Sequence, residues 1–280
     1  MNKLFKAELK RRLFSFLFLG EIIAIIGFNY NHILWHTYGF KVSADFFLFQ
    51  NFKYLCIFIG LNSCLQIGQE FENHTINNKL FLGFSKSVFY KHETIIGVIE
   101  AVILFFVDIL SVMVMSSMQK YTPLILNFKL LINSFTIIIT LTVVSFLSTA
   151  LAIIIKYRIP SVLIIICLTI FLFNAGESSS RSLMQPKQTT CFSLEGKLED
   201  NPLYVSGKTR TLHNLHVNIS PYGQAAHASY YPTETVKEKQ GNSLYLKRNS
   251  WHLEFILTDI LELIIIYAVG LYILKRRDLN

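Results

Sequence analysis

Long apolar stretches alternate with short polar ones along the 280-residue chain. A helix that crosses a bilayer needs about 20 consecutive, mostly apolar residues. Six segments meet or approach that length and are predicted to span: 13–28, 47–67, 94–118, 130–155, 160–173 and 252–274. The fifth is short, so it either spans with help from its flanks or enters the bilayer only in part.

The fourth and fifth segments are separated only by the sequence KYRIP. Lys156 and Arg158 are costly at the bilayer centre, and Pro160 suits the first turn of a new helix. The pattern predicts a tight helical hairpin that turns on a basic loop.

Basic residues in the short connections set the predicted orientation, because cytoplasmic loops of membrane proteins are enriched in Lys and Arg. With six spans, one side carries Lys3, Lys6, Lys10, Arg11, Arg12, Lys79, Lys86, Lys91, Lys156, Arg158, Lys275, Arg276 and Arg277. The short loops of the other side carry only Lys41, Lys120 and Lys129. Both termini are therefore predicted to be cytoplasmic.

The predicted fold class is an all-α integral membrane protein with six transmembrane helices. Residues 1–173 hold spans 1 to 5, with an amphipathic cytoplasmic helix at about 70–90 between spans 2 and 3. Residues 174–250 form an extracellular insert between spans 5 and 6, which its prolines and turn sequences mark as partly irregular. Residues 251–280 hold span 6 and a cytoplasmic tail.

Composition agrees with a multi-pass membrane protein, and the expected location is the plasma membrane. The chain is 52% hydrophobic and 16% charged, whereas soluble domains are about a quarter charged. The net charge of +8 does not indicate nucleic acid as a partner, because the basic residues lie at the ends of apolar segments next to lipid. Richness in Ile, Phe, Asn and Lys indicates an AT-rich bacterial genome.

The sequence contains no complete motif for enzymatic catalysis or metal binding. His92 begins a sequence like that of zinc proteases, but Ile96 stands where the second His is needed. No phosphate-binding loop and no nucleophile elbow occur. His213, His216 and His227 lack a zinc-ligand spacing, so no metal site and no catalytic residue is expected.

The polar segment 70–93, EFENHTINNKLFLGFSKSVFYKHE, interrupts the apolar pattern. Ile76, Leu80 and Phe84 recur every four residues and share one helical face, and Gly83 allows a break. The segment either rests on lipid headgroups or docks on a cytoplasmic partner.

This segment resembles the one that follows span 2 in permease subunits of type 2 ABC exporters. The matching residues are Glu70, Phe71, Asn73, Thr75, Ile76, Asn78, Lys79, Leu80, Ser85, Lys86 and Tyr90. His74 replaces the usual Gly and Asn77 the usual Arg. The ending LKRRDLN is also similar to that of the family, and NPLYVSG and SPYGQ resemble a low-GC Gram-positive subgroup.

The resemblance implies an exporter in which the segment is a coupling helix seated on a separate ATPase subunit. Two permease chains, as a homo- or heterodimer, would pair with two copies of the ABC ATPase, which binds ATP and Mg. The residues expected at the ATPase are Glu70, Glu72, Thr75, Lys79 and Leu80.

Ionisable residues inside the predicted spans have two interpretations. Glu100, Asp108 and Glu262 would form an acidic translocation lining for an amphipathic substrate, such as a peptide, an antimicrobial or a lipid-like molecule. Alternatively, they hydrogen-bond between helices or lie close enough to the interface to stay hydrated.

A second functional hypothesis is a non-transporting sensor or immunity protein with an extracellular ligand-binding region. Such a protein also needs an outer region and an inner docking helix. Dependence on an ATPase partner separates the two hypotheses.

Overall fold

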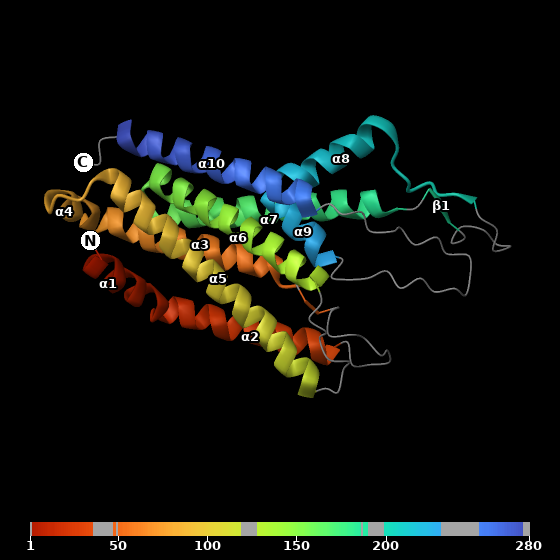
Figure 1. Ribbon diagram of the computed structural model, residues 1–280, viewed down its shortest axis with the longest axis horizontal. Coiled ribbons are helices and arrows are strands. Elements are labelled where there is room, and N and C mark those ends of the chain that lie inside the picture. Colours follow the sequence, from red (N-terminus) through yellow and green to blue (C-terminus); the bar gives the residue numbers. More distant parts are fainter. Residues whose placement is uncertain are drawn as a thin grey trace.

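The structure is a computed structural model, and it describes residues 2–35, 47–48, 50–118, 128–185, 187–189, 199–230 and 252–276. Most of this part of the chain is helical, and the long helices run along the long axis of the molecule (Figure 1). The helices are α1 (Asn2–Leu13), α2 (Phe16–Trp35), α3 (Phe52–Glu72), α4 (Thr75–Phe81), α5 (Lys86–Met118), α6 (Phe128–Ile155), α7 (Arg158–Met184), α8 (Gly207–Ile219), α9 (Pro221–Tyr230) and α10 (His252–Arg276). Strands β1 (Gln188–Thr189) and β2 (Glu199–Asp200) form a short antiparallel ladder.

Five of the described helices, α2, α5, α6, α7 and α10, are long and apolar enough to cross a membrane. They are compatible with a multi-pass membrane protein. Helix α5 has 33 residues, or about 50 Å at 1.5 Å per residue, so it is longer than the roughly 30 Å hydrocarbon core.

Helix α3 corresponds to the predicted second span but is not among the five. Its 21 residues are enough to span, yet Asn62, Ser63 and its glutamines lower its hydropathy. Helices α2, α5, α6, α7 and α9 pack around it, and both Asn62 and Ser63 are fully buried. A helix that protein surrounds needs no lipid-compatible surface, so polar residues are tolerated there.

Helix α7 agrees with the first alternative for the fifth segment, in which the flanks of residues 160–173 lengthen the helix enough to span. It continues for 27 residues, so residues 174–184 extend this helix. Two serine hydroxyls in these turns contact the neighbouring helices α8 and α9. Ser179 lies 3.0 Å from His216 and Ser180 lies 3.2 Å from His227, measured between hydroxyl oxygen and Nδ1.

The hairpin between α6 and α7 is confirmed. Helix α6 ends at Ile155, α7 begins at Arg158, and Lys156 turns the chain with a φ of 67°. Gly68 of α3 packs directly against this turn, since a Cβ at that position would lie 2.5 Å from the Cα of Arg158.

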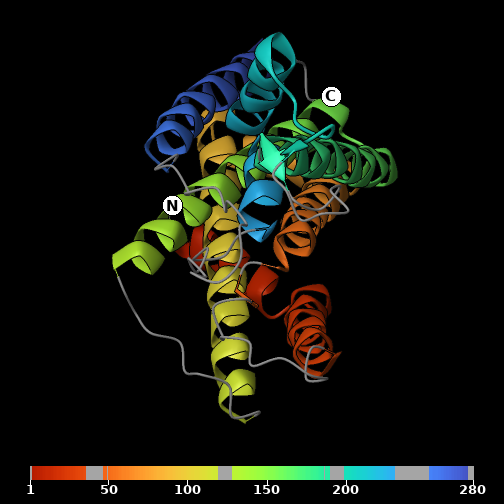
Figure 2. The same ribbon diagram turned by 90° about the vertical axis from the view of Figure 1, so that its right-hand side faces the viewer.

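The predicted external region is more ordered than its sequence indicates, because α9 packs into the bundle. Tyr222, Ala225 and Ala226 are buried in the main core, and the end-on view places α9 among α3, α6 and α7 (Figure 2). Helix α7 approaches it closely, since a Cβ on Gly176 would lie 2.5 Å from the Cα of Gly223.

The two ends of the bundle differ. The start of α1, the short α4 and the end of α10 lie at one end, and α8 and β1 lie toward the other (Figure 1). Lys41 and Lys120, which enter the charge comparison of the loops, lie outside the described residues.

Candidate functional site

The polar segment 70–93 folds into the last turn of α3, the separate helix α4 and the first turns of α5. His74 turns the chain with a φ of 54°, and Gly83 turns it again with a φ of 90°. The Ser85 hydroxyl oxygen then accepts a hydrogen bond of 3.3 Å from the Val88 backbone N–H at the start of α5. The helix predicted at about 70–90 is therefore restricted to residues 75–81, and Glu70 and Glu72 belong to α3.

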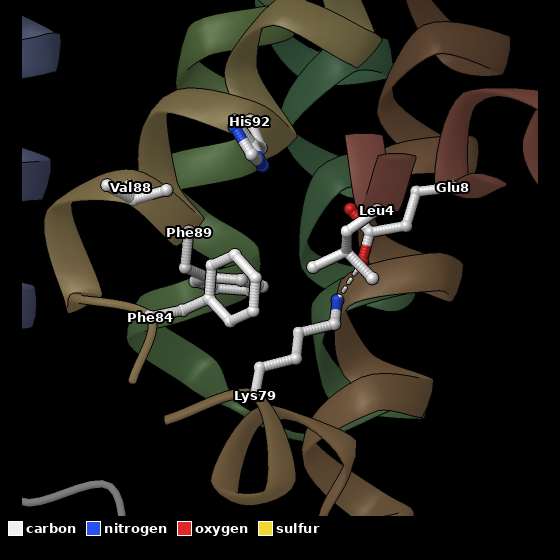
Figure 3. Close-up of a pocket in the computed structure, with 7 residues that line it drawn as sticks. All are labelled: Leu4, Glu8, Lys79, Phe84, Val88, Phe89 and His92. Carbon is white, nitrogen blue, oxygen red and sulfur yellow. Dashed lines mark ion pairs between the residues drawn. The ribbon is translucent and has the colours of Figure 1, made fainter. Parts of the chain in front are cut away.

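Lys79 points from α4 into the protein. Its Nζ donates to a carboxylate oxygen of Glu70 at 2.7 Å and forms an ion pair with Glu8 of α1. It also lies 5.3 Å from the centre of the Phe89 ring. Figure 3 shows Lys79 reaching toward Glu8 from across a small pocket. This side chain ties α4 to both α1 and α3.

The same end of the bundle holds an ion-pair network, defined here as Glu8, Arg11, Arg12, Glu70, Lys79, Glu93 and Glu100. The second Glu70 carboxylate oxygen accepts a hydrogen bond from Arg11 at 2.8 Å.

Burial acts to lower the pKa of Lys79, but the charges of Glu70 and Glu93 outweigh the effect of burial, so the pKa of Lys79 is raised. The ammonium form is therefore the stable one.

Arg12 is only 1% exposed and connects α1 to α5. Its guanidinium forms an ion pair with Glu93, and a second nitrogen lies 3.7 Å from Glu100. Burial lowers the pKa of Arg12, but Glu93 and Glu100 raise it by more. A buried Arg between two carboxylates holds its charge, and losing either partner would be costly.

The carboxylates of Glu8, Glu70 and Glu93 place oxygen atoms within 4.8 Å of one another. Lys79 and Arg12 already contact these three groups and supply positive charge to them. The pocket beside them has a volume of about 10 Å³, or about one water molecule. The arrangement is that of a structural ion-pair network.

The outward end of α4 is apolar. Phe81 is 89% exposed and Leu82 is 78% exposed, and we call these two residues the apolar tip. Leu80 is half-buried and packs on the core cluster that contains Ile76. The sequence interpretation missed the tip, although two adjacent apolar residues directly before Gly83 in a polar segment were a signal for it.

The predicted docking residues divide between two roles. Glu70 and Lys79 are 2% and 8% exposed and face each other inside the chain. Glu72 is exposed, and its carboxylate accepts a hydrogen bond from the Arg158 backbone. Thr75 is the first residue of α4 and is half-buried. The structure brings Glu70 and Lys79 together, while Phe81 and Leu82 face outward.

The residues predicted to line a translocation path lie in different places. Glu100 and Asp108 share the buried face of α5 that packs on α2 and α3. Asp108 Oδ1 accepts hydrogen bonds from Asn29 at 2.8 Å and Asn51 at 2.9 Å. Glu262 is half-buried on α10, three residues from the buried Asp259.

The chain was compared with protein-family models and with curated proteins, and neither comparison found a match. The fold is all-helical, and its five long apolar helices are compatible with a multi-pass membrane protein that holds the short helix α4 at one end.

Proposed function

We propose that this chain is the membrane-spanning permease subunit of an ATP-driven ABC exporter in the plasma membrane of a low-GC Gram-positive bacterium. Two such chains, or one and a related chain, would pair with two ATPase subunits that bind ATP and Mg. The transported substrate would be amphipathic, as a peptide, an antimicrobial or a lipid-like molecule is. The resemblance of residues 70–93 to exporter coupling segments supports this assignment.

The single observation that carries the proposal is the contrast between the two sides of α4. Its inward side is fixed by buried ion pairs, whereas the apolar tip of Phe81 and Leu82 is exposed. An exposed apolar pair on a fixed helix suits insertion into a groove of a protein partner. We assign that groove to the ATPase subunit.

The ion-pair network supports a way for the ATPase to act on the membrane helices. A displacement of α4 would pull on α1 through Glu8 and on α3 through Glu70, because both carboxylates contact Lys79. ATP binding shifts the conformation only if it favours one state of the permease over the other. In this proposal the favoured state is the one in which the ATPases have closed.

The test is copurification from native membranes in mild detergent, followed by mass spectrometry. The Phe81→Ser/Leu82→Ser double variant should lose the ATPase, because two apolar anchors are each worth on the order of 1–3 kcal/mol when buried. Leu203→Ser is the matched control, since Leu203 is 56% exposed in the loop that follows β2. Loss of the ATPase from the double variant alone supports the proposal.

A stable, membrane-inserted wild-type chain that brings down no ATPase would overturn it. That outcome would favour the second hypothesis, a non-transporting sensor or immunity protein. One structural observation supports that hypothesis. Helices α8 and α9 of the predicted outer region contact α7, and α9 also contacts α3, so a ligand bound outside would act directly on the bundle.

A further inference from the structure

Helix α8 carries a stripe of apolar side chains that the rest of the described chain leaves exposed. Leu212, Leu215 and Ile219 are 64%, 52% and 51% exposed. With 3.6 residues per turn, these positions lie on one narrow face of the helix, and Lys208 extends the same face toward the helix start. Single exposed apolar side chains are ordinary, but three in line on one helix indicate contact with an apolar partner.

The opposite face of α8 packs on the protein. His213 and His216 lie 3.1 and 3.0 Å from the Ser179 hydroxyl of α7, and Val217 on the same side is 2% exposed. Helix α8 lies at the periphery of the bundle, near the start of α10 (Figure 1 and Figure 2). The apolar stripe therefore points away from the bundle.

Two contacts fix the level of α8 along the long helices, measured from the end of the bundle that holds α4 (Figure 1). Ser179 is 21 residues beyond Arg158 at the start of α7, or about 32 Å at 1.5 Å per residue. The Asn218 amide donates a hydrogen bond of 3.1 Å to Glu254 of α10. Glu254 is 22 residues from Arg276 at the other end of α10, or about 33 Å. Both lengths match the hydrocarbon core of a bilayer, which is roughly 30 Å thick.

The features of α8 at this level are those of an interfacial helix. Such a helix turns its apolar side chains toward the acyl chains and keeps its polar side chains in the headgroup region. The long stem of Lys208 lets its charge reach the headgroups. The neighbouring first turns of α10 are also apolar and exposed, since Leu253 and Leu257 are 65% and 60% exposed.

We propose that α8 lies in the membrane–water interface on the side opposite to α4, with Leu212, Leu215 and Ile219 among the lipid acyl chains. The partner of the apolar stripe is the bilayer itself. Part of the region 174–250, which the sequence predicts to be extracellular, is then bound to the membrane surface. The proposal requires that α7 and α10 cross the membrane, as the proposed function also does, but it does not require an ATPase.

The test is quenching of tryptophan fluorescence by brominated phosphatidylcholine in nanodiscs that hold the purified full-length protein. The two native tryptophans, Trp35 and Trp251, are replaced by Phe, and Leu215→Trp then supplies a single reporter. Its emission should shift to shorter wavelength and lose intensity in brominated lipid relative to the same lipid without bromine. Acrylamide in the water should quench it weakly. Leu212→Trp, on the same stripe, is the second reporter should Leu215→Trp not fold.

Leu203→Trp is the matched control in water. Leu203 is 56% exposed and follows Asn201, whose amide donates to Gln185 at the end of α7. Gln185 is about 40 Å from Arg158 along the helix, beyond the hydrocarbon core, so acrylamide should quench this tryptophan and brominated lipid should not. Leu261→Trp is the lipid-facing reference, because Leu261 is 58% exposed on α10, and brominated lipid should quench it.

The proposal fails if acrylamide quenches Leu215→Trp and brominated lipid does not, because the stripe then faces water. It also fails if neither quencher reaches Leu215→Trp, since another protein surface would then cover the stripe. In both cases a quenched Leu261→Trp leaves the membrane topology intact. An unquenched Leu261→Trp would overturn this proposal together with the topology on which the proposed function rests.

Discussion

The Glu72 carboxylate accepts a hydrogen bond of 3.0 Å from the backbone N–H of Arg158. Glu72 ends α3 and Arg158 begins α7, so the bond joins two helix ends that are 86 residues apart in sequence. The first N–H groups of a helix have no partner within it, and a negative charge is favourable at that end. Glu72 therefore acts as an N-terminal cap supplied by another helix.

Removing this cap should weaken the α6–α7 hairpin. Glu72→Ala is expected to cost about 1 kcal/mol, the usual effect of losing a capping side chain. Glu72→Gln keeps an acceptor oxygen and should cost less. The measurement is the apparent unfolding temperature in detergent, and equal losses for the two variants would contradict a role for the acceptor oxygen.

Truncating Lys79 should be far more damaging than truncating Glu72. Lys79→Met leaves Glu8 buried without its cation, which typically costs about 3–5 kcal/mol, whereas Glu70 keeps its ion pair with Arg11. The double change Lys79→Met/Glu8→Gln removes the orphaned charge and should recover part of the loss. If Lys79→Met alone is as stable as wild type, the ion-pair network does not hold α4.

The same ion pairs predict a loss of stability in strong alkali. The pKa of Lys79 is raised above its ordinary value of 10.5 because Glu70 and Glu93 outweigh burial. A raised pKa for a base gives stability that is fully present below pH 10.5 and is lost as the pH rises through the folded-state value. The unfolding temperature should therefore fall above about pH 10.5 in wild type, and Lys79→Met should lack this component.

The sequence predicts a feature of this structure when the feature depends on neighbouring residues, and fails when it depends on contacts between distant parts of the chain. The hairpin at Lys156 and Arg158 was predictable, because charges and a proline leave a short turn few alternatives. The inward direction of Lys79 was not, since a lysine in a polar segment normally faces solvent and its carboxylate partner on α1 is 71 residues away. Helix α9 was missed because its ten residues are polar or small, and their burial depends on α3, α6 and α7.

His74 occupies a backbone conformation that favours glycine. Its φ of 54° is left-handed, which costs an L-residue roughly 1–2 kcal/mol. His74→Gly should remove the strain and stabilise the α3–α4 turn by about 1 kcal/mol, partly offset by the greater freedom of glycine in the unfolded chain. His74→Ala keeps the strain and should gain nothing. An unfolding temperature that rises equally for Gly and Ala would show that the backbone is not the cause.

At the other end of the bundle, two imidazoles share one hydroxyl. His216 Nδ1 lies 3.0 Å and His213 Nδ1 lies 3.1 Å from the Ser179 oxygen, which joins α8 to α7. Burial lowers the pKa of His216 below its ordinary 6.5, and the charge of His213 lowers it further. The neutral form is therefore the one that the folded protein favours.

A lowered pKa for a base means that the folded state binds its proton later than the unfolded chain does. Its contribution to stability is present above pH 6.5 and is lost as the pH falls below that value toward the folded-state pKa. Acidification from about pH 7.5 to about 5.5 should thus lower the unfolding temperature in wild type. His216→Gln should lose this acid-dependent component, and His213→Gln should reduce it, because a like charge has gone. If His216→Gln responds to acid as wild type does, the contact between α7 and α8 is not the one that protonation weakens.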